Sequence, residues 1–348
     1  MKLAAALTLF AGLALAVALL VWQGLGDIAA LLAVAGPWVP LVCLFHLLPI
    51  TATALSWRIL LSAGGLPGQS LVDLVWLRWL ADAINALLPV AQIGGEVVRG
   101  QALVRRHPGA GALIGAGIIV DLTLGLITLV WFILGGLALA AARDSVTSLL
   151  PMIGGVMVFA LALAMLHRLQ RSGLLLKLAH FLERQSGGSE RWRSLAGGAA
   201  DLDRELAALY RRPGPLLAAT GWRLAAWGLG ALEMGLALAI LGHPVSVLDM
   251  LILESVAQAF RNAGFAIPGA LGIQEGGLIL AGSLIGVPAE VALALALVKR
   301  VRDLALGVPA LLVWQGLELR GLRNPASAPA PALAGATELD PGTPALDG

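Results

Sequence analysis

The chain has 348 residues, of which 59% are hydrophobic and only 13% are charged, and its mean hydropathy is +0.88. This composition excludes an ordinary soluble protein and indicates an integral membrane protein. A pI near 9.1 agrees with basic loops beside an anionic leaflet, so nucleic-acid binding is not predicted. The single cysteine, Cys43, excludes an intramolecular disulfide framework and offers no metal cluster, and no cofactor is predicted.

Apolar stretches close to or above about 20 residues predict transmembrane helices, because backbone groups in lipid must be satisfied internally. The absence of period-two alternation argues against strands. The first stretch, residues 3–22, is predicted to be a membrane span; a signal peptide is the alternative, but its apolar region is usually shorter. Residues 40–61 form the next predicted span.

Residues 69–107 differ from the spans around them, because Asp73, Arg78 and Asp82 interrupt their apolar stripe. Residues 89–96 then form a glycine-rich break that ends in Glu96. A re-entrant hairpin fits this pattern, since irregular backbone at membrane depth is tolerated only inside protein or beside a wet cavity. The alternative is an amphipathic surface helix followed by a loop.

Two further spans are predicted at residues 110–141 and 148–167. Residues 168–213 contain nine Arg or Lys against five acids. The positive-inside rule places this basic loop and both chain termini on the cytoplasmic side of the membrane. We interpret the loop as a solvated amphipathic helix pair.

Residues 214–320 repeat the order of residues 40–141: a span, an interrupted hairpin and a long span. In both breaks a proline lies seven residues before a glutamate, and an asparagine precedes each break. The hairpins enter from opposite faces, which predicts an inverted-topology repeat whose interrupted helices meet at a substrate site near the midplane. Chance similarity of a short motif is the alternative.

The predicted fold is therefore an all-α, polytopic helical bundle with about six full spans and two re-entrant hairpins. It forms a single transmembrane domain over residues 1–320. Residues 321–348 are rich in Ala, Pro and Gly and are predicted to be disordered.

Charged residues within the predicted membrane segments are the candidate site, because each costs about 3 kcal/mol or more unless it pairs or faces water. Arginine and lysine are predicted to receive an anionic lipid headgroup, since guanidinium groups match phosphate. The predicted headgroup-binding residues are Asn85, Glu96, Arg99, Arg261, Asn262, Glu275, Lys299, Arg300 and Arg302, with Asp121, Arg223, Glu233 and Glu254 as supporting charges.

Glu96 and Glu275 have the most specific predicted role. They hold these cations in place, or take up protons that couple transport, and the repeat predicts that they lie close together near the bilayer centre. Interhelical salt bridges without a binding role are the alternative. The pairs Gly94-Gly95 and Gly276-Gly277 are predicted to be points of close helix packing.

Enzyme motifs are scarce. No Walker loop, HExxH, GxSxG or Cys/His ligand spacing appears, so no catalytic residue and no metal ligand are predicted. The five histidines are scattered and are interpreted as interface residues.

Four segments together resemble the lysylphosphatidylglycerol synthase transmembrane family, also called flippase-like: residues 85–99 (NALLPVAQIGGEVVR), 227–233 (WGLGALE), 268–275 (PGALGIQE) and 297–303 (LVKRVRD). The resemblance covers roughly residues 1–320 and is greatest to a membrane protein associated with hopanoid biosynthesis. It implies an inner-membrane protein that moves a lipid between leaflets, with hopanoid or anionic phospholipid as its partner. Synthase activity is not implied. The alternatives are an enzyme acting on lipid headgroups and a scaffold for lipid-biosynthesis enzymes.

Overall fold

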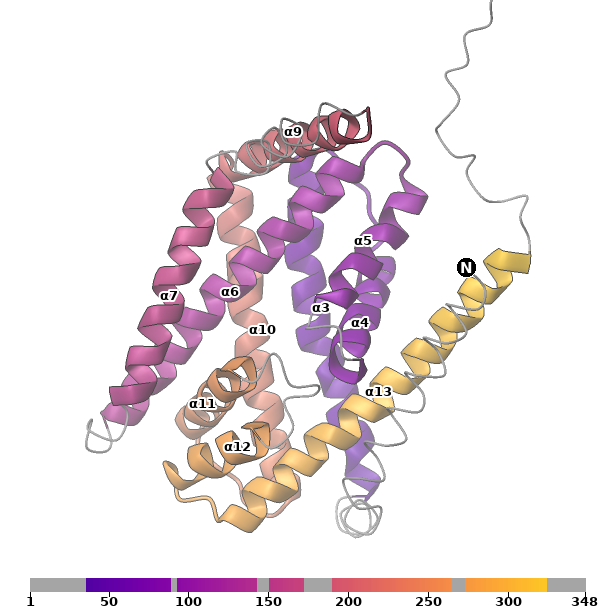
Figure 1. The fold of residues 1–348 in the computed structure, drawn as a ribbon. Helices are drawn as coiled ribbons and strands as arrows, with labels where there is room; N and C mark the ends of the chain where they lie inside the picture. Colours follow the sequence, from indigo (N-terminus) through magenta and orange to yellow (C-terminus); the bar gives the residue numbers. More distant parts are fainter. Residues whose placement is uncertain (1–35, 89–92, 143–149, 172–189, 264–272, 324–348) are drawn as a thin grey trace, which may run out of the picture.

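The computed structural model of the chain describes residues 36–88, 93–142, 150–171, 190–263 and 273–323. Within these ranges the chain forms ten α-helices, a short 3-10 helix (η1, Gly36–Trp38) and no strand, in agreement with the predicted all-α class (Figure 1). The α-helices are α3 (Val39–Gly64), α4 (Leu71–Leu87), α5 (Gly94–Arg106), α6 (Gly111–Ala141), α7 (Leu150–Arg171), α9 (Glu190–Tyr210), α10 (Pro213–Ile240), α11 (Val247–Ala263), α12 (Ile273–Ser283) and α13 (Ala289–Arg323).

Three segments are long and apolar enough to cross a membrane, and each lies at a predicted span: Gly36–Gly64, Gly111–Ala141 and Pro213–Ile240. Two further predicted spans coincide with α7 and with the 35-residue helix α13. The first predicted span, residues 3–22, and the predicted disordered tail from residue 324 onward lie outside the described residues.

The predicted first hairpin is present as α4 and α5, which pack against each other. Leu74, Leu77 and Leu80 of α4 are buried, so the apolar stripe of α4 packs against its neighbouring helices. At the start of α5, the backbone N–H of Gly95 donates to Oδ1 of Asn85 at 2.9 Å. Asn85 thereby satisfies one of the amides that a helix N-terminus leaves free. Residues 89–92 of the break lie outside the described residues.

The second hairpin consists of α11 and α12, which also pack against each other. Gly277 here matches Gly95 in the first hairpin: an added Cβ would overlap Phe260 of α11 at Gly277, and the backbone of Ala81 in α4 at Gly95. Both glycines therefore allow the second helix of a hairpin to approach the first closely, as predicted. Residues 268–272 of this break lie outside the described residues.

Gly277→Ala is expected to destabilise the protein by about 1–3 kcal/mol, because its added methyl group overlaps the Cβ of Phe260 and α12 has to shift. Gly276→Ala is the matched control, since Gly276 is exposed and an added Cβ there meets no atom within 4 Å. Denaturant unfolding of both variants in detergent measures the difference. Equal effects would contradict the close packing of α11 and α12.

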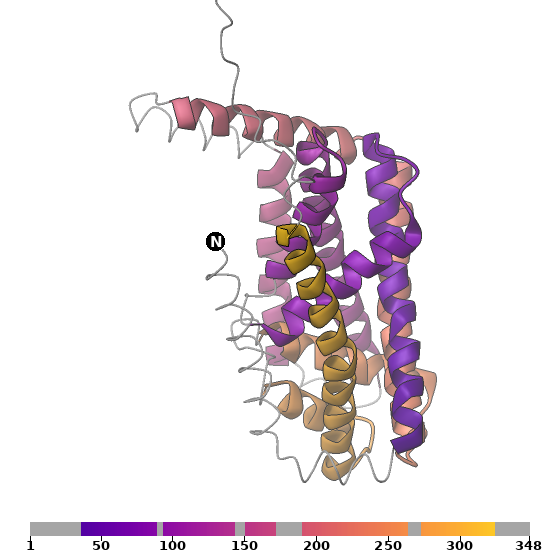
Figure 2. The same cartoon turned by 90° about the vertical axis from the view of Figure 1, so that its right-hand side faces the viewer.

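The two halves of the chain pack into each other. α3 lies beside α10 and runs antiparallel to it: Arg212 at the start of α10 bonds to the carbonyl of Ala63 near the end of α3 (Figures 1 and 2). At the other end, His46 of α3 contacts Glu233 of α10. The hairpin helix α4 packs against α13, and the hairpin helix α11 packs against α6. Each half thus supplies the long helix that covers the hairpin of the other.

The second part of the basic loop forms α9, which lies across the ends of the long helices (Figures 1 and 2). Leu206 and Leu209 of α9 are buried against α3 and α6. Tyr210 donates from its hydroxyl to Gln170 of α7 at 2.8 Å. One helix of the predicted pair is therefore present, and residues 172–189 lie outside the described residues.

Candidate functional site

Six charged side chains from four helices form one ion-pair network, which we call the Asp121 cluster: Arg78, Asp82, Glu96, Arg99, Asp121 and Arg223. Asp121 of α6 is fully buried. Its Oδ2 atom lies 2.9 Å from Nη2 of Arg99 and 2.5 Å from Nη2 of Arg223. Ser56 of α3 donates to its Oδ1 atom at 3.2 Å. Helices α3, α5 and α10 therefore meet at this one carboxylate of α6.

Glu96 links Arg99, which pairs with Asp121, to helix α4. It pairs with Arg99 within α5 and lies 3.3 Å from Nη1 of Arg78. Arg78 also pairs with Asp82 at 3.3 Å. The spacings of three residues on α5 and four on α4 place each pair on one helix face. The Arg99 guanidinium lies 4.3 Å from the ring centre of Trp57, a cation–π contact that adds to its fixed position.

The Asp121 cluster holds three cations and three carboxylates and is therefore neutral as a whole. Arg99 and Asp121 are both completely buried, and each isolated ion in such a place would cost several kcal/mol of desolvation. Pairing offsets this cost. Nη1 of Arg99 and Nε of Arg78 nevertheless donate to no atom among the described residues. The cluster therefore contains two buried donors without an acceptor among the described residues.

A second network, which we call the Glu233 cluster, joins α3, α10 and α13. It consists of His46, Glu233, Arg302 and Asp303. Glu233 accepts from Arg302 and, at 2.7 Å, from Nδ1 of His46. Arg302 also donates to Asp303 at 2.7 Å. Arg302 thus donates hydrogen bonds to two carboxylates.

Two more ion pairs hold the second hairpin to α13. Lys299 lies 3.2 Å from Glu254 of α11, which also accepts from Gln258 at 2.6 Å. Arg300 lies 3.2 Å from Glu275 of α12. The Lys299 and Glu254 side chains are only 9% and 5% exposed, whereas that of Glu275 is 22% exposed. The Arg300–Glu275 pair is therefore the more accessible of the two.

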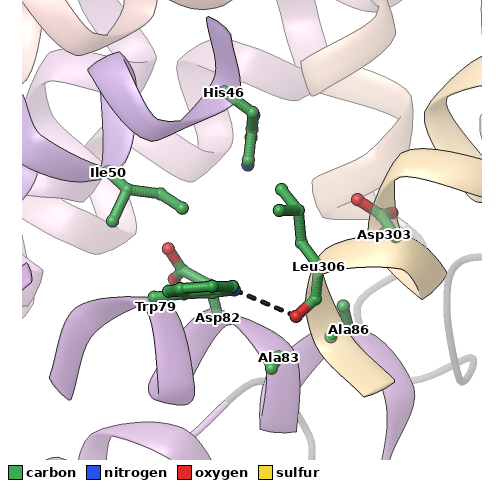
Figure 3. A pocket seen from close by; sticks show the side chains of 9 residues that line it. His46, Ile50, Trp79, Asp82, Ala83, Ala86, Asp303 and Leu306 are labelled. Atoms are coloured by element: carbon green, nitrogen blue, oxygen red, sulfur yellow. Dashed lines mark hydrogen bonds between the residues drawn. The ribbon is translucent and has the colours of Figure 1, made fainter. Parts of the chain in front are cut away.

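A small cavity separates the two networks, with a volume of about 30 Å³ and so room for one or two water molecules (Figure 3). His46 of α3, Asp82 of α4 and Asp303 of α13 line it. Trp79 forms one wall and donates from its indole N–H to the backbone carbonyl of Leu306 at 3.0 Å. Asp82 of the first half of the chain and Asp303 of the second half therefore line one small cavity. No group of His, Cys, Asp and Glu suited to a metal ion occurs among the described residues.

The predicted site residues divide between these networks. Glu96 contacts Arg78 and Arg99, whereas Glu275 contacts Arg300. Glu96 thus contacts cations of α4 and α5, and Glu275 contacts a cation of α13. This follows from the packing, because α5 lies on α4 and α6 while α12 lies on α11 and α13.

The remaining predicted residues have more local contacts. Asn85 accepts from the backbone of Gly95, and Asn262 donates to the backbone carbonyl of Gln258 at 2.8 Å. Arg261 of α11 places a positive charge near Asp303. Both asparagines thus bond to backbone groups of their own hairpins.

Sequence reasoning missed four residues of the networks: His46, Arg78, Asp82 and Asp303. Arg78 and Asp82 carried a usable signal, because their spacing of four in an apolar stripe is that of a pair on one helix face. His46 carried none, because its contact with Glu233, 187 residues away in the sequence, depends on the packing of α3 on α10.

Comparison with known families agrees with the predicted resemblance. The sequence model of the lysylphosphatidylglycerol synthase TM region matches residues 9–310. It gives no support for the hopanoid-associated protein in particular. No curated protein and no solved structure gives a significant match to the chain. The family match, with the three apolar helices, shows a multi-pass membrane protein.

Proposed function

The chain belongs to the lysylphosphatidylglycerol synthase transmembrane-region, or flippase-like, family, and from this premise we propose that it moves a polar lipid between membrane leaflets. The proposed cargo is hopanoid or another lipid with a polar or anionic headgroup, and the proposed location is a bacterial inner membrane with cytoplasmic termini. One observation carries the proposal: ionised side chains are buried beside both hairpins of an apolar bundle.

Buried charge of this kind supports a headgroup route. Burying a charged residue within a membrane protein costs free energy. Such residues almost always face the bundle interior or a water-filled cavity, where they mark pathways for polar substrates. A purely structural bundle of the same length could use apolar contacts at these positions. The acyl chains of a lipid can stay in the bilayer while its headgroup replaces a carboxylate as the acceptor of the arginine and lysine hydrogen bonds.

Packing across the two halves supports the inverted repeat on which the proposed route depends. The antiparallel pair of α3 and α10, the contact of α4 with α13 and the contact of α11 with α6 relate equivalent elements of residues 40–141 and 214–320. In transporters built from such repeats, interrupted helices meet at the substrate site. The proposed site therefore lies where the hairpins face the opposite long helices.

Arg300 is the proposed first contact of the headgroup, because its partner Glu275 is more exposed than Glu254 and Glu233, the acids that pair with Lys299 and Arg302. Arg99, Arg261, Lys299 and Arg302 are the proposed later partners. Exchange of Glu275 for a lipid phosphate would keep Arg300 paired throughout, so that no bare charge is left in the bundle.

The proposal is tested with purified protein in vesicles that contain a fluorescent lipid, whose outer-leaflet fraction is bleached by an impermeant reductant. Separate preparations carry an anionic phospholipid, a polar hopanoid or phosphatidylcholine. Wild-type protein is expected to move at least one of the first two faster than empty vesicles do. Arg300→Gln is expected to slow that movement about 10–100-fold, which corresponds to loss of one charge-assisted hydrogen bond of about 1.5–3 kcal/mol.

Arg204→Gln is the matched control, because Arg204 is 71% exposed on α9 and pairs only with Asp201 at the surface in the described structure. It is expected to leave the rate unchanged. Folded wild-type protein that moves no lipid faster than empty vesicles would contradict the proposed function. A headgroup altered in mass after incubation would favour an enzyme instead.

A further inference from the structure

Helices α3 and α13 each contain an internal proline, and both prolines lie beside the cavity between the two networks. Pro49 of α3 stands next to Ile50, which lines the cavity. Pro309 of α13 stands two residues after Gly307, which lines it as well. A proline donates no backbone hydrogen bond, and its ring pushes against the carbonyl four residues before it. Both helices are therefore weakened at the level of the cavity.

A side chain of α4 bonds to the backbone of α13 in the turn that Pro309 disturbs. Pro309 leaves the carbonyl of Ala305 without its helical donor. The next carbonyl, that of Leu306, accepts from the indole N–H of Trp79 at 3.0 Å (Figure 3). In membrane helices a proline is tolerated where neighbouring groups satisfy the backbone around it. Trp79 thus fixes the weakened turn of α13 against α4.

The two parts of α13 differ in how firmly they are held. Before Pro309, three of its cations form ion pairs with α10, α11 and α12: Lys299, Arg300 and Arg302. After Pro309, residues 310–317 contain no charged side chain, and Ala310 is the one buried residue among them. In Figure 1 the end of α13 extends away from α4 and α5. The second part of α13 is therefore the one with freedom to move.

We propose that Pro309 is a hinge of α13 and that the hydrogen bond between Trp79 and Leu306 is its latch. With the latch closed, α13 lies on α4 and forms one side of the cavity. With the latch open, the part of α13 after Pro309 swings away from α4, and the cavity opens toward the lipid between these two helices. The hinge itself does not rest on the proposed function, but its use as a lipid entrance does.

The hinge is tested by electron paramagnetic resonance on the full chain in lipid nanodiscs, in a Cys43→Ala background. Spin labels at Val72 of α4 and Leu317 of α13 define the hinge distance, because both side chains are more than half exposed. Leu317 lies about 12 Å along the helix beyond Pro309, so a change of about 20° in the bend moves it by about 4 Å. The mean hinge distance is expected to lengthen by about this amount in Trp79→Phe, which keeps an aromatic ring but cannot donate.

Labels at Leu248 of α11 and Leu293 of α13 supply the control distance, since both residues are exposed and the label on α13 precedes Pro309. This distance is expected to stay unchanged in Trp79→Phe. Pro309→Ala is the second variant, because it restores the missing helical hydrogen bond. When Trp79→Phe is added to Pro309→Ala, the hinge distance is expected not to lengthen.

Three outcomes would overturn the proposal. Trp79→Phe could leave the hinge distance unchanged, or lengthen the control distance as much as the hinge distance. It could also lengthen the hinge distance equally when Pro309→Ala is present, which would place the movement elsewhere in the bundle.

The vesicle assay tests the use of the hinge separately. Pro309→Ala is expected to slow lipid movement about tenfold or more, because a stiffened α13 keeps the cavity closed. If the hinge distance responds as expected but Pro309→Ala moves lipid at the wild-type rate, then the link to lipid movement is wrong and the hinge stands. If the wild type moves no lipid at all, the proposed function fails, while the hinge distance still decides whether Pro309 is a hinge.

Discussion

Asp121→Asn is expected to destabilise the protein by about 3–5 kcal/mol, the effect of removing one partner from a buried ion pair. The amide keeps the size of the carboxylate but removes the charge that Arg99 and Arg223 share. Both cations then remain buried without it, and the junction of α3, α5, α6 and α10 loses its central contact. The free energy of unfolding in detergent, from denaturant titration, measures this effect.

Asp73→Asn is the matched control for this prediction. Asp73 also pairs with an arginine, Arg106, at 3.2 Å, but the two side chains are 52% and 48% exposed. Exposed pairs contribute about 0–1 kcal/mol. A loss at Asp121 no larger than the loss at Asp73 would show that the Asp121 cluster is solvated.

Removing either charge of the Lys299–Glu254 pair is also expected to cost about 3–5 kcal/mol, since each single change leaves the other ion buried. Lys299→Met and Glu254→Gln remove the charge and nearly keep the shape. The double variant leaves neither ion uncompensated and is expected to regain most of the stability lost in either single variant. A double-mutant cycle of unfolding free energies measures this coupling.

Arg204 and Asp201 supply the control cycle, because they pair at 2.9 Å on the exposed face of α9. Their coupling is expected to stay below about 1 kcal/mol. Strict additivity of the two single losses at Lys299 and Glu254 would contradict a direct pair. A double variant that is stable yet inactive in the vesicle assay would separate a binding role from a structural one.

The positions of the helices could be predicted closely from the sequence. The span predicted at residues 110–141 is α6, Gly111–Ala141, and the breaks near Glu96 and Glu275 separate the helices of the two hairpins. These features depend on local properties: apolar length, polar interruption and glycine content. The need to satisfy every backbone group in lipid converts such local patterns directly into helices.

The pairing of the charges could not be predicted in the same way. Asp121 and Arg223 are 102 residues apart, and either could have met several other ions. Their contact depends on how α6 lies against α10, which the sequence pattern of each helix leaves open. The sequence therefore pointed to charged residues within the helices but not to the partner that each of them contacts.

The exchange of covering helices between the two halves also has a consequence for biogenesis. α4 is synthesised early, but α13, which covers it, is made more than 200 residues later. Asp121 likewise pairs with Arg223 only after α10 has been synthesised. The buried charges of the first half therefore remain incompletely paired until the second half has been synthesised, and α13 then packs against both hairpins.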